Sequence, residues 1–278
     1  MTSEQTYRAM QRLPQFPSLA TKLLRLLSHD DVDVRSIVNL IRSDSAMTSE
    51  LLRIVNSPVY SFAGRISSIQ SAVTLLGFDT VKSFALTVSM RSFLQASLRI
   101  DLLRRIWRHS LACAIVCEEL SAACSPVRRS DDRAYTAGLL HDIGRLCLFV
   151  EHPAEYGELL SKGARNDCEM LGKEEEMFGA NHYEVGAWLA SNWGFPEELQ
   201  GITAQHHGAV NPADFQLVDL VRVAVLLTGR LGFGIGEEET FPEVPQILSM
   251  LPVSAQYRCD PDPQQMKARI GDRLDSFD

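Results

Sequence analysis

Apolar residues recur at three- and four-residue steps along most of this chain, the spacing that gathers them on one face of an α-helix. Serine or aspartate, which cap helix N-termini, stands just before several of these runs. Sustained alternation of apolar and polar residues is absent, so we expect an all-α fold with little or no sheet. In the first hundred residues the pattern predicts helices over 18–28, from Asp33 to Ile41, over 45–55, from Ser67 or Ser68 to Gly77, and from Asp79 or Thr80 to about Leu98.

The second half of the chain continues the helical pattern but places histidines on the apolar faces. His109 shares a helix face with the apolar residue Ile106, so its side chain is expected to point inward. Segment 137–146 is apolar nearly all round and is predicted to form one buried helix with His141 and Asp142 in its middle. A buried aspartate requires a cation or hydrogen-bond donors, so this helix is a candidate to hold a metal.

Small residues flank this histidine–aspartate pair. Successive residues of a helix diverge by about 100°, so His141 and Asp142 can share a metal only if it lies between their two directions, close to the backbone. Gly138 and Gly144 would permit such a close approach, because neither carries a Cβ atom.

Two further predicted helices complete the set. One carries His182, with the small residue Gly186 one turn later. The other has Pro196 in its first turn, carries adjacent histidines at 206 and 207, and closes on Gly208. We therefore expect these histidines, like the earlier ones, to be positioned by helices.

Metal binding is the first hypothesis for these side chains as a group. A single histidine on an apolar helix face is more often a hydrogen-bonded core residue, but five of the seven histidines in one ordered series favour a site. Neutral imidazoles with one carboxylate suit Fe, Ni, Zn or Mn better than Ca. His29, in a polar connection, and His152, at a helix end, are interpreted as structural. The candidate ligands are His109, His141, Asp142, His182, His206 and His207.

This series resembles the HD phosphohydrolase superfamily, and segment 139–145 is most similar to its HD-GYP and HDOD branches. The N-terminal half favours HDOD, and no glycine-tyrosine-proline segment follows His207. The resemblance runs from about residue 10 to about residue 232. It implies an all-helical domain of bacterial signalling and regulation, related to phosphohydrolases but usually without demonstrated catalysis. The segments similar to the HDOD pattern are 13–17, 41–45, 51–58 and 67–77.

Two positions depart from the catalytic pattern of the superfamily. Val225 stands where HD enzymes place a final aspartate ligand, and Asp219, six residues earlier, is not a whole number of turns away. With Asp142 as the one charged ligand, we expect a single divalent ion at most. Arg145 stands where the HD-GYP pattern has lysine, and either grips phosphate or is a surface residue near a helix C-terminus.

The resemblance also suggests how the chain is divided. We expect an HDOD domain over 10–232, with an N-terminal helical lobe over 10–100 and an HD-like lobe over 101–232. Residues 233–278 are rich in glycine and proline and are predicted to form loops around two short helices. This extension either packs amphipathically on the body or serves as a partner-binding arm.

Composition agrees with a globular regulatory protein. The chain has 278 residues, of which 45% are apolar, and this is ample for a core. A net charge of -8 argues against broad binding to nucleic acid or to an anionic membrane. Local basic patches remain at Arg104, Arg105 and Arg108, and at Arg128–Arg129.

Other sequence features favour a cytoplasmic location. No secretory signal or run of roughly 18 apolar residues is present. The six cysteines show no Cys-x-x-Cys pair. Cys113 and Cys117 lie one helical turn apart and are interpreted as small core residues rather than a redox pair.

Three classes of function follow from these observations. The favoured one is a non-catalytic signalling module that binds a signalling protein or a nucleotide. The second is a metal-dependent phosphohydrolase acting on a nucleotide or cyclic dinucleotide, with Asp142 as bridge or base and Arg145 steadying phosphate. The third is a structural scaffold whose histidines satisfy one another and nearby carbonyl groups.

Overall fold

A computed structural model describes residues 1–25, 34–60, 62, 64–94, 98–127, 131–163, 167–236, 240–259 and 262–277. Across these residues the secondary structure is helical and contains no strand, so the predicted all-α fold class is confirmed. No helix in the described part of the chain is long and apolar enough to cross a membrane. Features predicted at His29, at Asp33, at Arg128 and Arg129, and over 26–28 lie outside the described residues.

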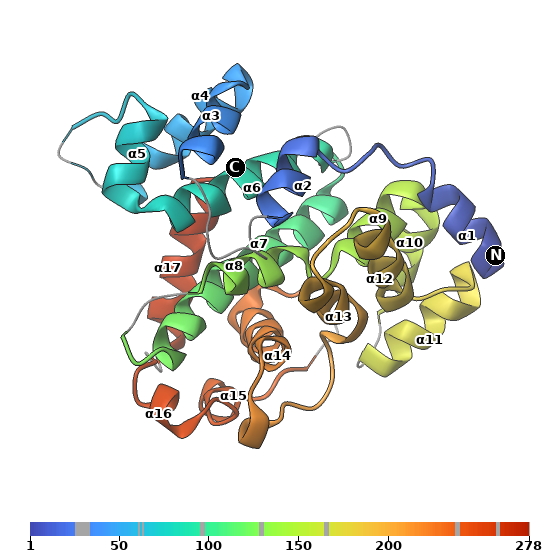
Figure 1. The fold of residues 1–278 in the computed structure, drawn as a ribbon. Coiled ribbons are helices and arrows are strands. Elements are labelled where there is room, and N and C mark those ends of the chain that lie inside the picture. The colour runs from blue at the N-terminus through green and yellow to red at the C-terminus, as the bar shows by residue number, and fades with distance from the viewer. Residues whose placement is uncertain are drawn as a thin grey trace.

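The N-terminal helices gather around helix α6, Phe78–Leu94 (Figure 1). The preceding helix begins after its N-cap Ser68, whose hydroxyl accepts a hydrogen bond from the Ser71 N–H, and ends at Gly77 with φ +88°. These ends agree with the prediction, whereas α6 begins one residue before Asp79. The helices packed against α6 are α2 (Ser18–Arg25), α3 (Val34–Arg42), α4 (Ser45–Val55) and α5 (Ile69–Leu76).

The second half is built on the long helix α7, Asp101–Cys124, which packs against α8 and α14. Helix α9 packs on α12, and α12 packs on α13. These pairs set the positions of the histidines, because each histidine lies on or beside one of these helices. The bounds are α8 (Asp132–Leu140), α9 (Ile143–Glu151), α10 (Pro153–Ser161), α11 (Asp167–Phe178), α12 (His182–Asn192), α13 (Glu197–Gln205) and α14 (Leu217–Thr228).

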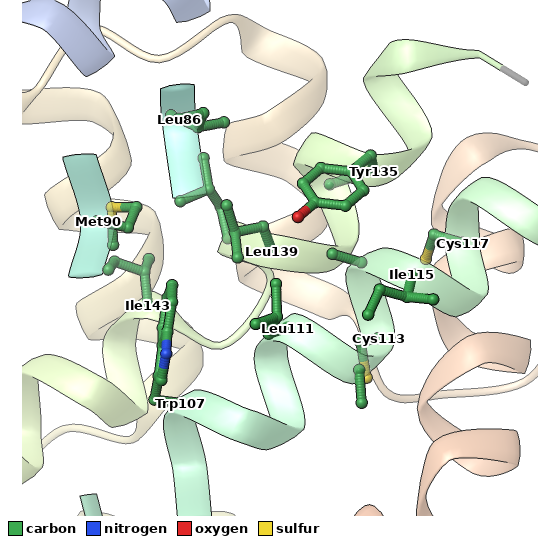
Figure 2. Close-up of a cluster of buried hydrophobic side chains, with 14 of the residues drawn as sticks. Leu86, Met90, Trp107, Leu111, Cys113, Ile115, Cys117, Tyr135, Leu139 and Ile143 are labelled. Atoms are coloured by element: carbon green, nitrogen blue, oxygen red, sulfur yellow. The ribbon is translucent and has the colours of Figure 1, made fainter. Parts of the chain in front are cut away.

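One hydrophobic core extends through both halves. Figure 2 shows Leu86 and Met90 of α6 beside Leu111 of α7, Leu139 of α8 and Ile143 of α9. All five belong to a single buried cluster. The division into two lobes near residue 100 therefore remains a prediction from the motifs.

The C-terminal extension packs on the body. A π-helix over Gly229–Phe233 follows α14, and three helices come after it where two were expected. Helix α17 contacts α7 and buries Met266, Ile270 and Leu274, which confirms the predicted amphipathic docking (Figure 1). The Arg273 guanidinium donates to a Glu118 carboxylate oxygen at 2.6 Å. The three helices are α15 (Val244–Leu248), α16 (Val253–Gln256) and α17 (Pro263–Asp275).

The first helix, α1, Ser3–Met10, lies against the second half of the chain rather than against α6. Its Tyr7 ring lies 5.5 Å from the ring of Trp188 in α12. The Thr6 hydroxyl donates to the carbonyl oxygen of Phe178 at the end of α11. Residues that precede the predicted domain thus brace the helices that carry the histidine cluster.

Candidate metal centre

The histidine–aspartate pair lies at a break between two helices. Helix α8 ends at Leu140 and α9 begins at Ile143, and Asp142 has φ -103° and ψ 25°, outside the helical region. The prediction of one continuous helix over 137–146 is therefore wrong. Both side chains of the pair are buried, with 2% of His141 and 1% of Asp142 exposed.

The glycines beside the histidine–aspartate pair serve helix packing instead of approach by a metal. A Cβ atom on Gly138 would lie 2.7 Å from the Ala114 Cα, so α8 and α7 touch backbone to backbone there. A Cβ atom on Gly144 would lie 2.0 Å from the His182 carbonyl oxygen and 2.6 Å from the Gly186 nitrogen. Glycine is thus required for α9 to approach α12 closely enough to place His182 beside the pair.

Asp142 is held by a cation from its own helix. The Arg145 Nε lies 2.8 Å from the Asp142 Oδ2, with 4% of the arginine side chain exposed. The interpretation of Arg145 as a surface residue is therefore wrong. Burial raises the pKa of Asp142, but the charge of Arg145 outweighs it, and the pKa lies well below the usual value. Asp142 is ionised at neutral pH.

A buried glutamate, Glu174, extends the series of polar contacts from Asp142 and Arg145 to His182, and the sequence did not predict it. Glu174 of α11 accepts hydrogen bonds through Oε2 from the His182 Nδ1 at 2.6 Å and from the His182 backbone N–H at 2.8 Å. The Tyr156 hydroxyl donates to the other carboxylate oxygen. Arg145 Nη2 lies 3.2 Å from His182 Nε2. Since arginine can only donate, His182 is neutral with its proton on Nδ1.

The same tautomer is set at two other histidines. His109 Nδ1 lies 2.9 Å from the carbonyl oxygen of Phe233, and His141 Nδ1 lies 2.7 Å from that of Gly138. A carbonyl accepts only from an N–H, so each ring carries its proton on Nδ1 and keeps a lone pair on Nε2. Metal-bound histidines are commonly oriented in this way by their second nitrogen.

The six candidate ligands do not form one undivided cluster. Two groups each bring three ligand atoms within 4.8 Å of one another: His109 with Cys113 and His141, and His182 with His206 and His207. The groups adjoin, because the rings of His141 and His206 are 4.9 Å apart. Asp142 faces the second group, with its Oδ1 3.6 Å from His206 Nε2 and 3.9 Å from His182 Nε2.

Cys113 is a ligand candidate that sequence reasoning assigned to the core. Its Sγ lies 3.6 Å from the Nε2 of His109, one turn earlier on α7. The signal was present as the four-residue spacing of the two side chains. Burial raises the pKa of the thiol, so Cys113 donates to His109 as a neutral group and is a poor metal ligand as it stands.

Burial keeps His109, His141, His182 and His206 neutral. It lowers the pKa of His109 to about 4 and that of His141 to about 3. Burial likewise lowers the pKa of His182, and burial together with the neighbouring His207 holds that of His206 well below its usual value. Neutral imidazoles are the form that binds metal, so the site needs no deprotonation at pH 7.

Unpartnered buried atoms indicate that the residues fit a cation. Asp142 Oδ1 and both ring nitrogens of His206 are buried without a hydrogen-bond partner. The 3.6 Å between Asp142 Oδ1 and His206 Nε2 is too long for a hydrogen bond. Leaving such groups unsatisfied costs about 1–3 kcal/mol each, and a divalent ion shared by the carboxylate and the imidazole would remove that cost.

The free space beside the centre is small. A cavity of about 40 Å³ is enough for an ion with a few waters, but ligand pockets are usually roughly 300–1,000 Å³. The Phe241 ring helps to close it and packs on Gly229, where a Cβ atom would lie 2.2 Å from the ring. The cavity is lined by His109, Asp142, Arg145, His207, Val225, Leu226, Ile235 and Phe241.

Val225 and Asp219, the two positions compared with the final aspartate ligand of HD enzymes, have different roles. Val225 lines the cavity beside Asp142, as expected if it replaces a ligand. The Asp219 carboxylate instead accepts from the backbone N–H groups of Asn211 at 3.1 Å and Gln216 at 3.0 Å, and from Arg222. Asp219 therefore braces the start of α14.

An all-α scaffold around a buried histidine–aspartate cluster defines a helical domain of the HD type. The HDOD domain family matches residues 13–209, and this chain belongs to that family. A relative that is 27% identical over 195 residues is an uncharacterized protein from Treponema pallidum (strain Nichols). The match spans 70% of this chain and 37% of that protein, so the chain corresponds to well under half of its relative.

Solved structures show the same fold. An HDOD domain protein of unknown function from Geobacter sulfurreducens is 22% identical with a TM-score of 0.70, over 97% of this chain and 92% of the other. A protein from Marinobacter aquaeolei VT8, provisionally named as a signal transduction protein, is 23% identical with a TM-score of 0.71, over 99% and 63%. A provisionally named phosphohydrolase from Shewanella amazonensis SB2B is 20% identical with a TM-score of 0.69, over 98% of each chain.

Proposed function

We propose that this HDOD protein is a cytoplasmic regulatory module that holds one divalent transition metal and does not hydrolyse phosphoesters. The observation that carries the proposal is the pair of buried, unpartnered groups, Asp142 Oδ1 and His206. These would hold the ion together with His207, which lies in the same group of ligand atoms, while His182, whose Nε2 accepts from Arg145, would support the site from beside it. Imidazole with one carboxylate suits Fe, Ni, Zn or Mn, and the ion would act as a structural or regulatory Lewis acid.

The arrangement supports one ion rather than two. Among the described residues, Asp142 is the one carboxylate that lines the cavity, and its other oxygen is already paired with Arg145. The group of His109, Cys113 and His141 has a neutral, hydrogen-bonded thiol where a further anionic ligand would be needed. Two divalent ions would therefore be poorly compensated.

Three features oppose turnover. Val225 supplies no ligand at the position that completes the catalytic set. The Arg145 guanidinium is engaged by Asp142 and His182, so it is not presented to a phosphate. The cavity of about 40 Å³ does not admit a nucleotide.

A regulatory module of this kind would act by binding a signalling protein or a nucleotide. The net charge of -8 favours neither nucleic acid nor an anionic membrane as the partner. The name of the Marinobacter aquaeolei VT8 protein refers to signal transduction, which supports the same class of function here.

Elemental analysis of untagged protein tests the proposal. We expect close to one metal ion per chain in the wild type, and its loss in the His141→Ala/Asp142→Ala variant. His152→Ala is the matched control, since His152 stacks on Phe178 outside the cluster, and it should retain the metal. Absence of metal from all three proteins would refute the metal site and favour the structural scaffold.

A second comparison separates binding from catalysis. Metal-loaded wild type should show no hydrolysis of a phosphodiester or a cyclic dinucleotide. Metal-dependent hydrolysis that disappears in Asp142→Ala would overturn the non-catalytic assignment. Val225→Asp adds a carboxylate to the cavity wall and should tighten metal binding by about tenfold, the lower end of the effect of a supporting ligand group.

A further inference from the structure

A second pocket, separate from the histidine cavity, lies between the first turns of α7 and the segment that follows the π-helix. Its volume is about 410 Å³, ten times that of the histidine cavity and within the usual range for small-molecule sites. Three arginines and a single aspartate supply its charged lining. The lining residues are Asp101, Arg104, Arg105, Arg108, Gly232, Phe233 and Gly234.

The arginines converge because of their spacing on one helix. Arg104 and Arg108 are four residues apart and Arg105 is adjacent, so all three project from neighbouring turns of α7. In the sequence they form a local basic patch with no assigned function. The chain as a whole carries a net charge of -8, which repels anions. The three arginines make the potential positive at this pocket, so a multiply charged anion would be attracted there.

A fourth cationic side chain, that of Lys267, lies beside Gly232 in the lining of the pocket. A Cβ atom on Gly232, which has φ +90°, would lie 3.0 Å from Lys267 Nζ. Lys267 belongs to α17 and its side chain is exposed. The left-handed backbone at Gly232 and its lack of a side chain leave room for the ammonium group beside this lining residue of the pocket.

Two ion pairs made by these arginines can be exchanged for contacts with a ligand. Arg104 pairs with Asp101 and Arg108 with Asp275, whose side chains are 94% and 72% exposed. Ion pairs with such exposed partners contribute about 0–1 kcal/mol. Charge-assisted hydrogen bonds from arginine to phosphate are stronger and two-pronged. A phosphate group would therefore compete well with the carboxylates.

We infer that this pocket binds a phosphorylated small molecule that carries at least two negative charges, such as pyrophosphate or a nucleoside diphosphate. Arg104, Arg105 and Arg108 would hold the phosphate groups, and Lys267, beside Gly232, would add a further positive charge. The site needs no metal in the histidine centre and stands independently of it.

The position of the pocket suits a regulatory ligand. The Phe233 carbonyl in its wall accepts from His109, and the Arg105 Nη1 donates to the Ile235 carbonyl at 3.4 Å. Ile235 in turn lines the histidine cavity. A ligand that draws Arg105 away from Ile235 would act directly on the wall that the two sites share.

Calorimetric titration of the full chain with inorganic pyrophosphate tests the inference. The protein is first stripped of metal and dialysed, so that binding through a metal in the histidine centre is excluded. We expect saturable 1:1 binding that weakens as salt is raised, and that Arg105→Ala and Lys267→Ala each weaken by about tenfold through loss of a charge-assisted contact. The two variants alter different helices, and unchanged melting temperatures show that both remain folded.

Arg8→Ala is the matched control, since Arg8 is an exposed arginine of α1 that pairs with Glu4. It should bind pyrophosphate within twofold of the wild type. The inference is overturned if the wild type does not bind millimolar pyrophosphate, if both pocket variants bind as tightly as the wild type, or if Arg8→Ala loses as much affinity as they do. None of these outcomes depends on whether metal occupies the histidine centre.

Discussion

Replacing Gly144 with alanine tests whether the contact between α9 and α12 holds the centre together. The new Cβ atom would lie 2.0 Å from the His182 carbonyl oxygen, whereas ordinary contacts begin at 3.4 Å. The obstacle is backbone, which cannot rotate away as a side chain can. The two helices must therefore separate by about 1.4 Å, the difference between these two distances.

Such a separation has two measurable consequences. Overpacking typically costs about 1–3 kcal/mol and occasionally more, and a backbone clash of this size places Gly144→Ala near the top, at about 3 kcal/mol. The same movement breaks the 3.2 Å contact between Arg145 and His182, so metal content should fall as well. Urea denaturation followed by circular dichroism measures the first effect, and elemental analysis the second.

Gly172→Ala is the matched control. Gly172 also lies inside a helix, α11, but a Cβ atom there meets nothing within 4 Å. Alanine should stabilise the protein at that position by about 0.4–1 kcal/mol, because it restricts the unfolded chain. If Gly144→Ala unfolds at the same urea concentration as Gly172→Ala, the close packing of α9 on α12 is refuted.

Two further predictions concern the buried charges. In metal-free protein the unfolding free energy should fall as the pH drops from about 6.5 towards 4, because unfolded histidines protonate near 6.5 whereas folded His109 and His141 do so near 4 and 3. The slope should approach about 1.4 kcal/mol per pH unit for each such histidine. A stability that does not change with pH in denaturant titrations would contradict this prediction. Glu174→Gln removes the charge that orients His182 and should weaken metal binding roughly 10–100-fold. The control Glu176→Gln, which changes an exposed neighbour, should bind metal as tightly as the wild type. Equal metal affinities of the two variants in a metal titration would exclude the orienting role of Glu174.

The sequence by itself determined the helical architecture and most of the candidate ligands. Helical periodicity, the cap at Ser68 and the stop at Gly77 depend on residues a few positions apart, so the ends of α5 were predicted from local pattern. The docking of α17 was also predicted from local pattern, because an apolar stripe along a helix has to pack against some other surface of the protein. The HDOD family followed from several motifs in one order.

Tertiary structure alone decided how those ligands are arranged. Helical periodicity placed Asp142 in the middle of a helix, but in the folded chain the helix breaks at that residue. Glu174 reads as one more charge in the acidic run of α11, and only the approach of α12 makes it the buried partner of His182. The covering of the centre by Phe241 likewise joins residues distant in sequence. Local patterns record which face of a helix is buried, whereas the identity of the group facing it depends on helices that meet only in the folded chain.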